Sequence, residues 1–398
     1  MSNSPDAPYE LGRAERLGSV LGFRAGQALA GAVGAVALVA GIGSGSSAGL
    51  AAGVVAALVA AGVATLPVAG RGLDEWVPVA ASHLARVRGG ALCAGASVQP
   101  GANGSMPAHL RWPDGTATVV ARLSHRGLRA LAPEPRSLGE SLASWLRGLS
   151  SAGAPRWTVT FVTTTGPGRS PHAAPWVDAG MRVTSCVAVT APEPVRVGDA
   201  LAFAGVEGAA DLGVDGLDEL LASRVSPGYA TILGCDVAAR WHLLEAPVTV
   251  HAAFVVEEWP MGRVDEQVLA PLCVSRDRRT VALCIRVEEL RAARQRTARV
   301  RTAAAADGQM IARGGFLASP EADRDADRDA ARAGELAVGH GSMRIVGAIA
   351  LDARDVVELE AAAARLYADA ASCGVRLRRC DGDHRRGVLA TVPGWCVP

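Results

Sequence analysis

The hydrophobic pattern is most distinctive near the start of the chain, where two long apolar runs follow each other. The first covers about residues 25–43 and the second about 48–66, and neither contains a charge. A helix rising about 1.5 Å per residue needs roughly 20 residues to cross a hydrocarbon core of about 30 Å. Residues 44–47, Ser-Gly-Ser-Ser, suffice only for a tight turn. The pattern predicts a two-helix transmembrane hairpin, and an alanine-rich hairpin buried in protein is the alternative.

Arginines flank both ends of this hairpin, and its turn contains none. They are Arg13, Arg16 and Arg24 before it, and Arg71, Arg86 and Arg88 after it. Because basic residues favour the cytoplasmic side of a membrane, this distribution predicts a two-pass protein of the plasma membrane with both termini in the cytoplasm.

Small residues recur along the second run. Gly45, Gly49 and Gly53 stand at every fourth position, which places them on one helix face where another backbone can approach closely. We predict that they are helix-packing positions, against either the first run of the same hairpin or a helix of another protein. Neither run contains an ionisable residue, which disfavours a transporter or pump.

The hydrophobic and polar pattern also divides the rest of the chain. We predict a disordered cytoplasmic tail, the hairpin, a juxtamembrane amphipathic helix and a cytoplasmic α+β domain in two parts. Their residue ranges are 1–17, 18–70, 71–90, 91–245 and 246–398. For 71–90, a plain first helix of the cytoplasmic domain is the alternative.

Within the α+β domain, strand-like alternation and helical periodicity follow each other, with several strands adjacent in sequence. This order predicts an α+β domain with a mixed sheet. The predicted strands include 116–123, 157–164, 183–190, 248–257, 279–287, 342–351, 375–379 and 386–392. The predicted helices include 137–149, 264–272, 288–309, 322–336 and 355–372.

The composition of the chain excludes some kinds of binding and catalysis. The 398 residues contain 40 basic and 39 acidic side chains, and every basic one is arginine. A net charge of +1 gives no support for nucleic-acid binding. Without lysine, the chain cannot form a Schiff base or a Walker A motif. Its eight cysteines form no Cys-x-x-Cys pair, and we interpret them as reduced, buried thiols.

No constellation of acid, base and nucleophile stands out. Gly166–Ser170 lacks a lysine, and His340-Gly341-Ser342 is not accompanied by a Gly-x-Ser-x-Gly elbow in the predicted cytoplasmic domain. Asp381–His384 has no partner cluster for a metal. Glu257 and Glu258 are adjacent on a predicted strand, so they point to opposite faces. We therefore predict no enzymatic activity, catalytic residue, cofactor or metal.

Several short motifs, taken in order, carry a family resemblance. They are Glu75–Val79, Glu258–Pro260, Arg279–Val281, Glu335–Gly341, Leu377–Gly382 and Val388–Pro393. With the hairpin before them, they resemble EccE, the two-span membrane subunit of actinobacterial type VII secretion complexes. The later motifs also resemble proteins encoded beside actinobacterial conjugation ATPases, whose soluble part looks like the non-motor domain of those ATPases. The resemblance covers the hairpin and about residues 246–398.

The resemblance implies a membrane-anchored structural subunit whose cytoplasmic domain docks on an ATPase motor or channel partner, with the bilayer and other secretion subunits as further partners. We name Trp76, Trp259, Pro260 and His340 as partner-contact candidates. A subunit of a conjugation (type IV-like) machine is the close alternative. A membrane-tethered enzyme using the loop 166–178 with Glu257 or Glu258 is the third hypothesis.

Overall fold

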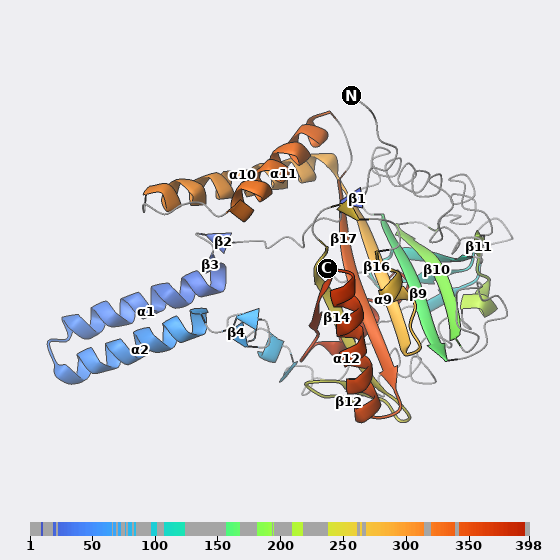
Figure 1. Ribbon diagram of the computed structural model, residues 1–398, viewed down its shortest axis with the longest axis horizontal. Coiled ribbons are helices and arrows are strands. Elements are labelled where there is room, and N and C mark those ends of the chain that lie inside the picture. The colour runs from blue at the N-terminus through green and yellow to red at the C-terminus, as the bar shows by residue number, and fades with distance from the viewer. Residues whose placement is uncertain are drawn as a thin grey trace. The chain divides into compact units, whose positions relative to one another are not determined.

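The computed structural model separates the chain into two compact units (Figure 1). The sheet unit comprises residues 1–14, 91–290 and 339–398, and the helical unit comprises 15–90 and 291–338. The structure describes residues 9–10, 19–20, 23–65, 67–68, 71–72, 76, 79–81, 83–84, 97–101, 107–123, 157–167, 181–192, 194, 209–217, 238–260, 263–264, 268–313, 320–338 and 342–394.

One large sheet dominates the sheet unit. Over the described residues it has 12 strands, in the order β12-β13-β14-β17-β16-β9-β10-β8-β7-β6, with β11 beside β8 and β18 beside β14. The strands are β6 (Ser97–Gln99), β7 (His109–Arg111), β8 (Ala117–Leu123), β9 (Thr158–Pro167), β10 (Met181–Ala191), β11 (Ala209–Asp211), β12 (Ala238–Ala239), β13 (Leu244–Glu245), β14 (Val250–Glu258), β16 (Arg278–Glu288), β17 (Ser342–Ala353) and β18 (Arg376–Arg379). Short two-stranded pairs join β1 (Tyr9–Glu10) to β15 (Arg263–Val264), β2 (Ser19–Val20) to β3 (Phe23–Arg24), and β4 (Pro67–Val68) to β5 (Arg71–Gly72).

Every strand pairing in the described part of the chain is antiparallel. The predicted mixed sheet is therefore wrong. The prediction took the helices between strands as crossovers that lead to parallel neighbours. Two of those helices, α10 (Leu290–Arg313) and α11 (Pro320–Ala337), lie between β16 and β17 in sequence, yet these two strands pair antiparallel from Arg278↔Asp352 to Glu288↔Ser342.

Both faces of the sheet are covered around β14. Side chains alternate between the two faces of a strand, so neighbouring residues of β14 pack into different cores. Phe254 packs with Leu359 and Leu366 of α12 (Val356–Ser372) in one hydrophobic core. Its neighbour Ala253 packs with Leu389 of α13 (His384–Leu389) in another. This two-sided covering accounts for the nearly continuous burial of β14, where alternation is hard to see in the sequence.

Helix α12 is held at both ends by local hydrogen bonds. The Asp355 carboxylate accepts from the Glu358 N–H at 2.8 Å, and the Glu358 carboxylate accepts from the Arg354 N–H at 2.9 Å. This is close to a capping box, except that the Glu358 carboxylate reaches the N–H one residue before the N-cap Asp355. At the other end, Gly374 adopts φ +67°, and the Val375 N–H donates back to the Ala370 carbonyl at 2.8 Å. The positive φ favours glycine there.

In the helical unit, α1 (Ala25–Gly43) and α2 (Ser47–Thr65) form a hairpin in the two predicted apolar runs. Gly45 turns the chain with φ +62°, and the Ser46 hydroxyl accepts from the Gly49 N–H at 3.0 Å. The helices approach closely because the positions between them are small. A Cβ built on Gly53 would lie 2.8 Å from the Ala37 carbonyl oxygen.

Within the part of the chain that the structure describes, no helix has the length and the apolar character that crossing a membrane requires. Most positions in α1 and α2 are alanine or glycine, whose small side chains gain little free energy on leaving water. The predicted transmembrane hairpin and two-pass plasma-membrane location are therefore contradicted.

Two smaller predictions are also wrong. Residues 386–392 were predicted as a strand from their apolar side chains, but α13 is a helix with both of its apolar residues, Val388 and Leu389, buried. For 264–272 a helix was predicted, where the structure has strand β15 and the short helix α9 (Ala270–Cys273). The predicted helix 137–149 lies outside the described residues.

Candidate functional site

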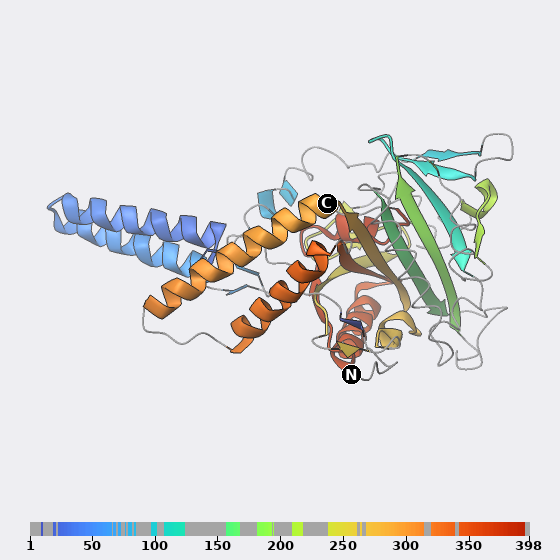
Figure 2. The same cartoon turned by 90° about the horizontal axis from the view of Figure 1, so that it is seen from above.

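The candidate site is a groove between α10 and α11 in the helical unit, where Figure 2 shows the two helices side by side. The groove has a volume of about 410 Å³. Its lining residues are Arg294, Thr297, Ala298 and Arg301 from α10, and Ala333, Leu336 and Ala337 from α11. Small and apolar side chains thus form the floor, and two arginines stand along the α10 side.

Arg294 holds the two helices together at one end of the groove. Its guanidinium donates to the Leu336 carbonyl at 2.7 and 2.9 Å, and to the Ala337 carbonyl at 3.3 Å. The last carbonyls of a helix have no partner within the helix and carry partial negative charge, so a cation is favourable there. Arg294 is therefore a cap on the carboxyl end of α11.

The two helices carry opposite charge. Helix α10 contains six arginines and one aspartate, whereas α11 contains six carboxylates and three arginines. Four exposed arginines of α10 make no hydrogen bond or ion pair with any described residue: Arg291, Arg299, Arg301 and Arg313. One of them, Arg301, lines the groove. The groove therefore presents, beside an apolar floor, a cation that pairs with no residue in the described part of the chain.

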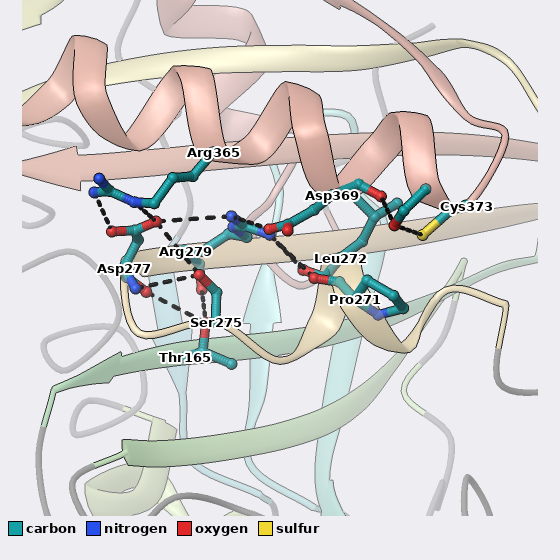
Figure 3. A network of polar contacts seen from close by, with 10 residues as sticks. Thr165, Pro271, Leu272, Ser275, Asp277, Arg279, Arg365, Asp369 and Cys373 are labelled. Carbon is teal, nitrogen blue, oxygen red and sulfur yellow. Dashed lines mark hydrogen bonds and ion pairs between the residues drawn. The ribbon is translucent and has the colours of Figure 1, made fainter.

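A fully buried charged side chain, that of Arg279, lies in the sheet unit, where Figure 3 shows it on β16 facing α12. Its guanidinium donates to Asp369 at 2.9 Å and to the carbonyls of Pro271 and Leu272 at 3.3 Å. Arg365 completes the network by donating twice to Asp277, at 2.7 and 3.0 Å. The network joins α9, β16 and α12, and we assign it a structural role because its charges are paired within the fold.

Two thiols lie beside this network. Burial raises the pKa of Cys273 to about 12, and burial also raises that of Cys373. Neither thiol forms a disulfide, nor do those of Cys186 and Cys380, whereas Cys284 is disulfide-bonded. The prediction of reduced thiols throughout is thus wrong for Cys284. A raised pKa keeps a thiol protonated at neutral pH, so neither Cys273 nor Cys373 is set up as a nucleophile.

A Thr-His-Asp arrangement lies in the sheet, but it is buried. His251 on β14 makes a 2.6 Å hydrogen bond to Asp352, its cross-strand partner on β17, and a 2.9 Å hydrogen bond to Thr249. The His251 ring is fully buried, and Thr249 is 5% exposed. Such a group is not reached by a substrate in this conformation, and its hydrogen bonds satisfy buried polar atoms of the core.

A second histidine cluster surrounds Asp381. His242 approaches one Asp381 oxygen at 3.2 Å and His384 approaches the same atom at 3.5 Å, with Arg379 at 3.7 Å. The His384 Nδ1 accepts the Ala253 N–H at 3.0 Å. Across the described ranges, no group of three or more His, Cys, Asp or Glu residues is arranged to hold a metal ion.

The carboxylates of the third hypothesis are paired with arginines. Arg376 on β18 lies 3.2 Å from Glu257 and 2.8 Å from Glu258, and Arg378 lies 3.6 Å from Glu257. Of the predicted active-site loop 166–178, only residues 166 and 167 are described. Glu257 and Glu258 therefore belong to an ion-pair cluster along β14 and β18.

The structure distributes the predicted site residues over both units. In the hairpin, Gly45 occupies the turn, Gly49 lies against Ser44 and Ser46, and Gly53 lies between the helices. Trp76 is half-buried, Trp259 is 3% exposed within the main core, Pro260 is buried, and His340 lies outside the described residues. Trp259 packs over Gly347, where a Cβ would meet its ring at 2.9 Å. We therefore look for partner contacts elsewhere.

Sequence reasoning missed the groove and the Arg279 network. A signal for the groove exists in the sequence, since Arg294, Ala298 and Arg301 share one helix face and Ala333 and Ala337 share another. Nothing in the sequence shows that these faces meet. No sequence pattern around Arg279 predicts its network, because its partner Asp369 comes from a distant part of the chain.

A comparison with models of known protein families and with curated proteins finds no match for this chain.

Proposed function

We propose that this chain is a non-enzymatic structural subunit of a type VII-like secretion apparatus, which docks on a motor or channel partner. The proposal starts from the ordered motifs that resemble EccE. The observation that supports docking is the groove between α10 and α11, with an apolar floor and beside it Arg301, which pairs with no described residue. An apolar surface with an arginine at its edge has the composition of a protein interface.

Co-purification tests this function. The tagged full-length protein is purified from gently lysed cells of its own source, and the accompanying proteins are identified by mass spectrometry. We expect an FtsK-like motor and other secretion subunits with the unmodified chain, and their loss from an Ala333→Arg variant, which places a bulky cation in the groove. Arg313→Ala, which alters an arginine outside the groove lining, is the matched control and keeps the complex.

Two results would overturn the proposal. One is recovery of the unmodified chain as a lone monomer or homodimer. The other is recovery with a conjugation-type ATPase and no secretion subunit, which would move the chain to a type IV-like machine.

A further inference from the structure

The floor of the α10–α11 groove continues along α11. Ala333 and Ala337 line the groove, and Ala326 and Ala330 stand on the same helix face at spacings of three and four residues. Methyl side chains let another helix approach closely. The floor is therefore suited to a helix more than to a flat or extended ligand.

The charges beside this floor determine which charge the bound helix should carry. On α10, Arg301 lies on the same face as Arg294 and Ala298, two helical turns from Arg294 and about 10.5 Å along the axis. Arg294 is occupied by the α11 carbonyls, whereas Arg301 makes no hydrogen bond or ion pair with any described residue and is exposed. A carboxylate on an incoming helix could pair with Arg301 in the fork geometry that guanidinium favours.

We propose that the groove binds an acidic amphipathic helix of the partner protein, with an alanine- or leucine-lined stripe on the floor and carboxylates toward α10. This inference rests on the proposed function and names the chemistry of its partner. The α11 side of the groove is apolar, and α11 as a whole carries six carboxylates against three arginines, so a polyanion such as a single strand of nucleic acid is disfavoured beside it. A helix with one acidic flank can direct its carboxylates toward Arg301 and its apolar stripe toward α11.

The probes are two synthetic helical peptides of about 20 residues, a length at which binding can stabilise a helix. Both carry the same Ala/Leu stripe; one has glutamates on the flank and the other has lysines at the same positions. Binding to the purified full-length chain is measured by fluorescence polarisation. We expect the glutamate peptide to bind at least about tenfold more tightly, and its affinity to fall as salt is raised.

Variants of α10 and α11 locate the binding. Arg301→Glu should weaken the glutamate peptide about tenfold and improve the lysine peptide, which simple misfolding would not do. Arg313→Glu makes the same charge change on the same helix outside the groove lining, and should alter either affinity less than about threefold. Ala333→Leu fills the floor and should weaken both peptides, with an unchanged circular dichroism spectrum as evidence that the chain is folded.

Equal binding of the two peptides, no binding of the glutamate peptide, or tighter binding of a single-stranded oligonucleotide would overturn the inference. So would a homodimer that Arg301→Glu disperses, because a second copy would then occupy the groove. These results are separable from the proposed function: co-purification of the motor with a failed peptide experiment rejects only the acidic helix. Glutamate-peptide binding without secretion subunits rejects only the secretion assignment.

Discussion

The guanidinium of Arg279 on β16 donates to the carboxylate of Asp369 on α12 across 2.9 Å, although 90 residues separate them in the chain. The arginine side chain is fully buried, whereas that of Asp369 is 35% exposed. The pair therefore fastens the helix to the sheet with a cation that cannot reach water and an anion that partly can. Loss of the buried arginine should therefore cost more than loss of an exposed arginine in the same network.

Replacing Arg279 with methionine should lower the free energy of unfolding by about 1–3 kcal/mol, because it leaves the carbonyls of Pro271 and Leu272 without their donor. The shift in urea midpoint measures this loss. Arg365→Ala is the control. Its side chain is 55% exposed, so loss of its contact with Asp277 should cost less than about 1 kcal/mol. Equal effects would contradict the assignment.

His384 should make stability depend on pH. Burial is the main cause that lowers its pKa, opposed by the nearby Asp381 carboxylate, and its Nδ1 must stay unprotonated to accept the Ala253 N–H. The unfolded state therefore binds a proton more readily, and the free energy of unfolding falls as the pH drops below about 6.5.

Through this one histidine, the free energy of unfolding can change by at most about 1.4 kcal/mol per pH unit. Urea unfolding at pH 7.5 and 5.5 measures it. His384→Gln should flatten the dependence, because the titrating group is then absent. An unchanged slope in His384→Gln would show that another group is responsible.

Gly347→Ala should destabilise the sheet unit by about 1–3 kcal/mol, the usual cost of overpacking a core. The added methyl would lie 2.4 Å from a Val256 methyl and 2.9 Å from the Trp259 ring. Urea unfolding gives the magnitude. Gly334→Ala is the matched control, because a Cβ at this α11 position meets nothing within 4 Å. It should instead stabilise its helix by about 0.5–1 kcal/mol.

Gly53→Ala should loosen the α1–α2 hairpin. The new methyl would meet the backbone of Ala37 at 2.8 Å and of Gly41 at 3.1 Å, and backbone atoms move only if a helix moves. We expect faster amide hydrogen exchange over both helices, read by mass spectrometry. Gly31→Ala, with nothing within 4 Å, should slow exchange or leave it unchanged. Unchanged exchange in Gly53→Ala would show that the helices tolerate wider spacing.

The sequence by itself determined the local elements with strong, regular patterns. The runs that became α1 and α2, and the predicted helix 355–372 that became α12, are readable because a helix depends on neighbours three or four residues away. The long strands β9, β10, β14, β16 and β17 were also anticipated, within a few residues at their ends.

Tertiary structure alone decided what these elements do together. Antiparallel pairing of β16 with β17 across 53 intervening residues, the burial of Arg279 and the meeting of Arg301 with the alanine face of α11 all depend on contacts between residues far apart in the chain. Residues 386–392 show the same limit, since an apolar run fits a strand or a buried helix equally well until its neighbours are known. Periodicity reports which side of an element is apolar, but only packing decides which surface covers it.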